Sequence, residues 1–138
     1  MPGYSGTPLP KKLGIKDGLR VAFAGAPSDV LTELKSALAS CEVARDLSRD
    51  EKEPLDFAMV FTKSKLELAK EFKRMSKTLA PAGMLWVSWP KKSSGVASDL
   101  DENIVRDIGL AAGLVDVKVC AVTEIWSGLK FVRRLKDR

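Results

Sequence analysis

The segment LDFAMVF, Leu55–Phe61, decides the fold because it is apolar at every position except Asp56. A strand with one face in water alternates apolar and polar residues, whereas a strand covered on both faces does not need to alternate. MLWVSW, Met84–Trp89, repeats this apolar character after an intervening helical segment. Strand, helix and strand in this order predict two parallel neighbours in a sheet, joined by a helix that crosses one face.

The segments around these two strands carry the signals of covering helices. Ser64 and Glu67 form a capping box at the start of the helix between the strands. Upstream, LRVAFAG (Leu19–Gly25) predicts another buried strand, and Ser28 or Asp29 is expected to cap the helix that follows it. The apolar stripes of these helices are predicted to be Leu68, Phe72, Met75 and Leu79 for the first, and Val30, Leu31, Leu34 and Leu38 for the second.

The C-terminal third has a different pattern. Asp99 and Glu102 predict a second capping box, for a helix that stops at Gly113. Val115–Ala121 alternates apolar and polar residues, which is typical of a half-exposed strand. Leu129–Arg134 predicts a last strand, and the short connection between the two favours an antiparallel hairpin.

These elements together predict an α/β protein. We expect a three-layer sandwich with a reduced, Rossmann-like, mostly parallel sheet and an antiparallel C-terminal hairpin. Glu42–Leu47 predicts a weaker strand, and residues 48–54 an exposed loop. The length of 138 residues corresponds to about one domain, and we expect an N-terminal arm over residues 1–18 and a single domain over residues 19–138.

Composition limits the chemistry. The chain has no histidine, which excludes Ser-His-Asp and Cys-His catalysis and histidine metal ligands. Cys41 and Cys120 lack metal-ligand spacing, and helix capping explains the carboxylates of Asp99, Asp101 and Glu102, so no metal is expected. No apolar run approaches the ~20 residues of a membrane span, and the N-terminus lacks the apolar stretch of a signal peptide. We therefore expect a cytoplasmic protein.

The order of elements also resembles that of a known enzyme family. LAPAGMLWVSWP (Leu79–Pro90), preceded by LDFAMVF and an amphipathic helix, resembles the second half of the class I methyltransferases that use S-adenosylmethionine. The resemblance covers residues 55–134 and implies a methyltransferase-like topology. The first strand departs from it, because Gly25-Ala26-Pro27 stands where that family has a Gly-x-Gly-x-Gly-like turn, and proline has no N–H. Asp46 stands about where the family has an acidic residue.

A second resemblance spans almost the whole chain. Its stretches are GYSGTPLPKKLGI (Gly3–Ile15), LWVSWPKKSSGVASDL (Leu85–Leu100) and GLVDVKVCAVTEIWSGLKFVRR (Gly113–Arg134). They resemble an uncharacterised bacterial family, catalogued only as a domain of unknown function. The resemblance implies a single-domain bacterial protein and assigns no activity.

Polar and glycine residues follow three of the predicted strands at the point where each strand ends. Ligands of open α/β sheets usually sit outside the carboxyl ends of the strands, where the strand order reverses. Ser64 opens a helix whose N–H groups favour an anion, neighbouring lysines add positive charge, and Trp89 could stack on a ring. The predicted ligand site consists of Gly25, Thr62, Lys63, Ser64, Trp89, Lys91, Lys92 and Ser94.

The same residues also have a purely structural interpretation. Trp86 and Trp89 lie three apart on a strand and therefore point to opposite faces, where each could fill core. The lysines after Trp89 could be solvated loop charge. Lys11 and Lys12 belong either to a solvated arm or to a lid that clamps an anion.

Three hypotheses for function follow. The first is a small-ligand binding module for an anion or a nucleotide-like molecule, without catalysis and without a resident cofactor. The alternatives are a divergent S-adenosylmethionine-dependent methyltransferase and a basic-surface domain that binds nucleic acid or protein, since the net charge is +5. An exposed edge strand would also allow a homo-oligomer.

Overall fold

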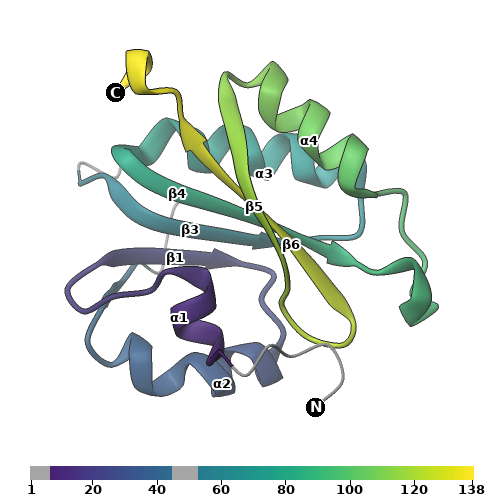
Figure 1. Ribbon diagram of the computed structural model, residues 1–138, viewed down its shortest axis with the longest axis horizontal. Coiled ribbons are helices and arrows are strands. Elements are labelled where there is room, and N and C mark those ends of the chain that lie inside the picture. The colour runs from purple at the N-terminus through teal and green to yellow at the C-terminus, as the bar shows by residue number, and fades with distance from the viewer. Residues whose placement is uncertain (1–6, 45–52) are drawn as a thin grey trace.

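The computed structural model describes residues 7–44 and 53–138, and within these ranges the chain forms a six-stranded mixed sheet (Figure 1). The strand order is β2-β1-β3-β4-β6-β5. β2, β1, β3 and β4 are parallel neighbours, and β6 runs antiparallel to both β4 and β5. The strands are β1 (Arg20–Ala24), β2 (Glu42–Val43), β3 (Leu55–Phe61), β4 (Leu79–Pro90), β5 (Leu114–Ala121) and β6 (Trp126–Arg133).

Helices cover both faces of this sheet. α1 (Leu9–Leu13) and α2 (Ser28–Leu38) lie on one face, and α3 (Lys65–Thr78) and α4 (Glu102–Ala111) lie on the other (Figure 1). Two short 3₁₀ helices, η1 (Lys92–Ser94) and η2 (Leu135–Asp137), follow β4 and β6. The predicted three-layer α/β sandwich with an antiparallel C-terminal hairpin is therefore confirmed.

β3 lies at the centre of the parallel part, between β1 and β4. Every residue of the strand is buried except Asp56, which is half-buried. The carboxylate of Asp56 accepts a 2.9 Å hydrogen bond from the main-chain N–H of Arg20, at the start of β1. The single polar residue of the segment thus pairs with a backbone donor, and the apolar positions serve two cores at once.

The side chains of β3 and β4 divide between these two cores. Trp86 packs with α1 and α2, together with Phe57 and Met59, whereas Trp89 packs with α3 and α4, together with Ala58. The two tryptophans thus lie on opposite faces of the sheet, as their spacing in the sequence predicts.

β4 begins earlier than the sequence predicts. We expected it to start at Met84, but Leu79 already pairs with Leu55 of β3, and the register shifts between this pair and Phe57. Gly83 allows the irregularity, because a Cβ at this position would lie 2.7 Å from the main-chain oxygen of Leu55. The Arg133 side chain then donates to the main-chain oxygen of Leu79 at 2.9 Å, which ties this end of β4 to β6.

Two helix starts also differ from the prediction. The N-cap of α2 is Pro27, which makes no side-chain capping hydrogen bond, and neither Ser28 nor Asp29 takes that role. α4 is capped by Asp101, whose carboxylate accepts from Ile104 N–H at 2.8 Å, and not by Asp99. Neighbouring polar residues compete for a cap, and the path of the chain before the helix decides which of them reaches the first turn.

Smaller differences concern apolar positions and strand ends. Leu31 of α2 is 39 % exposed and is not part of the buried stripe. β6 starts at Trp126 rather than at Leu129, and the Trp126 ring packs edge-on against Phe61 at a centroid distance of 5.3 Å. The predicted strand over Glu42–Leu47 is observed as β2, and its residues 45–47 lie outside the described residues. Within the described ranges, no helix is long and apolar enough to cross a membrane.

Candidate functional site

The point where the strand order reverses lies between β1 and β3. β1 leads into α2 on one face of the sheet, whereas β3 leads into α3 on the other face. The two connections therefore separate at the carboxyl ends of neighbouring strands, which is where open α/β sheets bind their ligands. Of the predicted site residues, Gly25 lies at the tip of β1, and Thr62, Lys63 and Ser64 follow β3.

Gly25 brings these two strand tips into close contact. Its φ angle is +70°, and a Cβ at this position would lie 2.5 Å from the main-chain oxygen of Phe61. Only glycine fits such an approach without displacing backbone. The glycine therefore allows the turn after β1 to lie directly against the end of β3.

The turn after β3 is held by its own hydrogen bonds. The buried Thr62 donates its N–H to Ser88 O at 3.1 Å, and its hydroxyl accepts from Ser64 N–H at 3.2 Å. The main-chain oxygen of Lys63 accepts from Ser98 Oγ at 2.9 Å and from Asp99 N–H at 3.2 Å. The backbone of Lys63 is therefore fixed, and its side chain is exposed to solvent.

The first turn of α3 is occupied by groups of the chain itself. Ser64 Oγ accepts from Glu67 N–H at 3.2 Å, which is one half of the predicted capping box. The carboxylate of Asp99 accepts from Lys65 N–H at 2.7 Å. A negative charge therefore already stands at the position that was predicted to hold an external anion.

The residues after β4 divide between core and surface. Trp89 is 5 % exposed and packs in the core with Leu100, so little of its ring faces a ligand. Lys91 donates its main-chain N–H to Ile125 O at 2.7 Å, which joins this loop to the β5–β6 turn. Ser94 Oγ donates to Lys91 O at 2.6 Å, and Lys92 is exposed.

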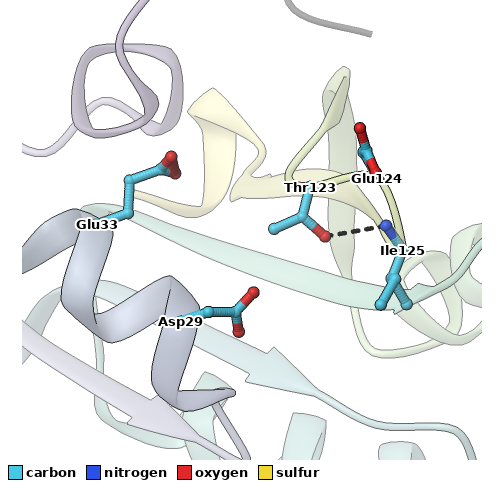
Figure 2. Close-up of a pocket in the computed structure, with 5 residues that line it drawn as sticks. All are labelled: Asp29, Glu33, Thr123, Glu124 and Ile125. Atoms are coloured by element: carbon cyan, nitrogen blue, oxygen red, sulfur yellow. Dashed lines mark hydrogen bonds between the residues drawn. The ribbon is translucent and has the colours of Figure 1, made fainter. Parts of the chain in front are cut away.

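A further hollow, which sequence reasoning did not find, lies between α2 and the β5–β6 turn (Figure 2). It has a volume of about 330 Å³ and is lined by Asp29, Glu33 and residues 123–125. Figure 2 shows the two carboxylates of α2 across from the turn, where Thr123 Oγ1 accepts from Ile125 N–H at 3.0 Å. Residues 29 and 33 share one helix face by their spacing, but the position of the turn depends on the sheet order.

This hollow does not amount to a metal centre. Among the described residues, no group of three or more His, Cys, Asp or Glu side chains is arranged to hold a metal ion. Its third acid, Glu124, is exposed on the turn. Carboxylates in an open hollow are solvated, and they give this part of the surface a negative potential.

Solved structures of two methyltransferases and of a pre-rRNA processing protein share the fold. Magnesium protoporphyrin IX methyltransferase from Synechocystis PCC 6803, with bound SAH, aligns at 15 % identity over 86 % of this chain and 75 % of its own, with a TM-score of 0.56. A putative methyltransferase from Thermoplasma acidophilum aligns at 9 % identity over 94 % and 75 %, with a TM-score of 0.58. The fibrillarin pre-rRNA processing protein of Methanococcus jannaschii aligns at 14 % identity over 92 % and 69 %, with a TM-score of 0.55. At these identities the likeness shows the fold alone, and it confirms the methyltransferase-like topology.

The turn after β1 does not fit a cofactor such as the SAH bound to the Synechocystis enzyme. A Cβ on Gly25 would point at the main-chain oxygen of Phe61. The glycine in Gly25-Ala26-Pro27 therefore allows contact between two strands and not the approach of a cofactor. Pro27, at the N-cap of α2, has no N–H to offer a ligand. Asp46, the acid that the resemblance suggested, lies outside the described residues. No step of methyl transfer follows from the residues that the structure describes.

The comparison with protein families gives a match over nearly the whole chain. No curated protein matches the sequence. One family model, described as "Protein of unknown function (DUF3052)", matches residues 10–135. The matched region covers nearly all of the chain, including the loop after Trp89 and the C-terminal hairpin that suggested such a family. The chain therefore belongs to the DUF3052 family of proteins of unknown function.

Proposed function

We propose that this protein is a binding module for a small anionic ligand, and that the ligand sits at the carboxyl ends of β1 and β3. The observation that carries the proposal is the separation of α2 and α3 to opposite faces at the tips of two adjacent strands. Open α/β sheets bind their ligands outside such a pair of strand ends, and Gly25, Thr62 and Lys63 lie at this edge of the sheet.

The charge at this edge supports an anion. Lys63 and Lys92 are exposed, and neither has an ion pair with a carboxylate in the described part of the chain. Because Asp99 and Ser64 already engage the first turn of α3, the ligand would be held by lysine ammonium groups rather than by helix N–H groups. Lysines are point charges on flexible stems, and such a site would accept phosphate or carboxylate.

The side chains at this edge favour binding over catalysis, because the carboxylate of Asp99 already accepts a hydrogen bond from Lys65 N–H. Thr62, Lys63 and Ser64 supply hydroxyl and ammonium groups but no carboxylate or imidazole that could act as a base near neutral pH. The Thr62 hydroxyl and the Ser64 Oγ are both engaged in local turns. A nucleophile with an adjacent base is the minimum for covalent catalysis, and these three residues do not form one.

The test is a thermal-shift screen with nucleotides, sugar phosphates and small carboxylates. We expect at least one phosphate-bearing compound to raise the melting temperature, with the shift lost in Lys63→Gln. Lys70→Gln is the matched control, since Lys70 is an exposed lysine within α3, away from the strand ends, and it should leave the shift unchanged. A flat response across the panel, or an equal loss in both variants, would contradict the proposal.

Methyl transfer is the alternative that the fold favours. The neighbours with bound SAM or SAH support it, and the single glycine and the proline in the β1–α2 turn oppose it. Calorimetric titration with S-adenosylmethionine distinguishes methyl transfer from the binding of a small anion. Saturable heat that Lys63→Gln does not weaken would favour a methyltransferase, and no heat at millimolar concentration would remove that alternative.

A further inference from the structure

A second, positively charged cavity lies between α1 and the edge strand β5, away from the tips of β1 and β3. It has a volume of about 500 Å³, within the range of small-molecule sites. Its lining consists of Thr7, Lys11, Lys12 and residues 118–121. β5 is three strands away from β3, which corresponds to about 14 Å across the sheet, so this cavity is distinct from the ligand site proposed at the tips of β1 and β3.

Reciprocal hydrogen bonds fix two of the lysines in this cavity. The ammonium of Lys12 donates to Ala121 O at 3.1 Å, and the ammonium of Lys118 donates to Lys12 O at 2.9 Å. Lys12 is only 9 % exposed, so a charged side chain is largely buried at this position. The two bonds attach α1 to β5 and hold the ammonium groups in place before any ligand arrives, which lowers the entropy that binding must overcome.

Further lysines lie close to this cavity. Lys118 lies opposite Lys130 in the β5–β6 ladder. The pKa of Lys130 is lowered, first by burial and then by repulsion from Lys118 and Lys16. In the described ranges, Lys11, Lys118 and Lys130 form no ion pair with a carboxylate, whereas Arg20, Arg74 and Arg106 do.

The donors of Lys118 are available for a ligand. An ammonium has three N–H donors, and Lys12 O takes one from Lys118. The exposed Lys11 stands at the rim of the same cavity. Several lysines that converge on one concavity suit a ligand with two or more negative charges, because each charge can take its own charge-assisted hydrogen bonds.

We propose that the cavity between α1 and β5 binds a phosphorylated small molecule through Lys11, Lys12 and Lys118. A single-stranded nucleic acid fits it less well, since the lining carries no aromatic ring on which a base could stack. The thiol of Cys120 belongs to the same lining and therefore lies beside the bound ligand.

The first experiment titrates inorganic pyrophosphate into the protein by calorimetry. We expect the Kd to rise roughly tenfold in Lys118→Gln, the loss expected for one charge-assisted contact. Lys11→Gln should give a comparable loss without touching the hydrogen bonds between α1 and β5. Lys136→Gln, in the exposed η2, removes the same charge elsewhere and should change the Kd by less than about twofold.

The second experiment uses the reactivity of Cys120 to detect ligand binding. Bound pyrophosphate should slow the alkylation of Cys120, measured by peptide mass mapping. Cys41, which directly precedes β2 at the opposite edge of the sheet and lies outside the cavity lining, serves as the internal control and should react at an unchanged rate.

Three results would overturn the proposal. They are the absence of heat at millimolar pyrophosphate, an equal loss of affinity in Lys136→Gln, and tighter binding of an RNA oligonucleotide than of pyrophosphate with the same dependence on Lys118. The last result would assign the lysines to a nucleic-acid surface. Because Lys63 lies outside this cavity, Lys63→Gln should leave pyrophosphate binding intact, so failure here and failure at the strand tips are distinguishable.

Discussion

The indole Nε1 of Trp86 donates a 2.9 Å hydrogen bond to the main-chain oxygen of Leu13, 73 residues earlier in the chain. Both residues are fully buried. The bond attaches the end of α1 to β4, in the middle of the sheet. α1 has only five residues, too few to be stable alone, so its position depends on contacts of this kind.

Trp86→Phe should destabilise the protein by removing this donor. The main-chain oxygen of Leu13 would then be buried without its partner, which costs roughly 1–3 kcal/mol in addition to the loss of ring volume. Urea denaturation gives the free energy of unfolding. Trp89→Phe is the matched control, since it removes the same atoms from a 5 % exposed tryptophan with no described indole hydrogen bond. Equal losses in the two variants would mean that the hydrogen bond contributes nothing measurable.

Gly25→Ala should disrupt the contact between the tips of β1 and β3. The φ of +70° costs an alanine roughly 1–2 kcal/mol, and the clash of its Cβ with Phe61 O adds roughly 1–3 kcal/mol. Gly18→Ala isolates the first cost, because Gly18 has a φ of +82° but open space around the Cβ position. Thermal and urea unfolding compare the two variants, and a Gly25→Ala variant no less stable than Gly18→Ala would rule out the close approach.

Asp99→Ala should weaken the start of α3 rather than the start of α4. Its carboxylate accepts from Lys65 N–H, so its loss should lower the free energy of unfolding by roughly 0.5–2 kcal/mol. Asp107→Ala removes an exposed carboxylate within α4 and should change stability by no more than about 0.5 kcal/mol. Amide hydrogen exchange should show faster exchange at Lys65 in Asp99→Ala only, and unchanged exchange there would contradict the assignment.

Cys120 should titrate at a higher pH in the folded protein than in the unfolded chain. Burial raises the pKa of its thiol, and the positive charges of Lys12, Lys118 and Lys91 offset only part of this rise. Because the folded pKa is the higher one, the thiol stabilises the fold fully below its unfolded pKa, and this contribution is lost as the pH rises through the folded pKa.

The rate of alkylation reports the pKa of the Cys120 thiol, because the thiolate is the reactive form. The pH–rate profile of Cys120 in the folded protein should lie at higher pH than that of the same residue in urea, and Lys118→Gln should move it higher still. A folded profile at the same or lower pH would contradict the effect of burial.

Much of the fold could be predicted from local pattern. The bounds of β3 were predicted correctly from the apolar run of Leu55–Phe61, because polar segments flank this run on both sides and mark its ends. The spacing of Trp86 and Trp89 placed them on opposite faces. Prediction failed where several side chains compete for one role, as at Asp99 and Asp101, since the outcome depends on where the preceding loop runs.

Tertiary contacts divide the predicted site residues between the strand tips and the core. Gly25, Thr62 and Lys63 lie at the tips of adjacent strands, as strand order in a parallel sheet requires. The burial of Trp89 depends on how α4 and its preceding loop pack, and nothing in its neighbours along the chain decides it.

The sequence by itself determined the layers, the parallel strands and the faces on which their side chains lie, because periodicity and apolar runs act over a few residues. Only the tertiary structure decided that Asp99 occupies the first turn of α3 and that Lys12 and Lys118 meet across α1 and β5. Those contacts join residues 34 and 106 positions apart. They depend on the order of strands in the sheet and the paths of its loops, which local spacing does not encode.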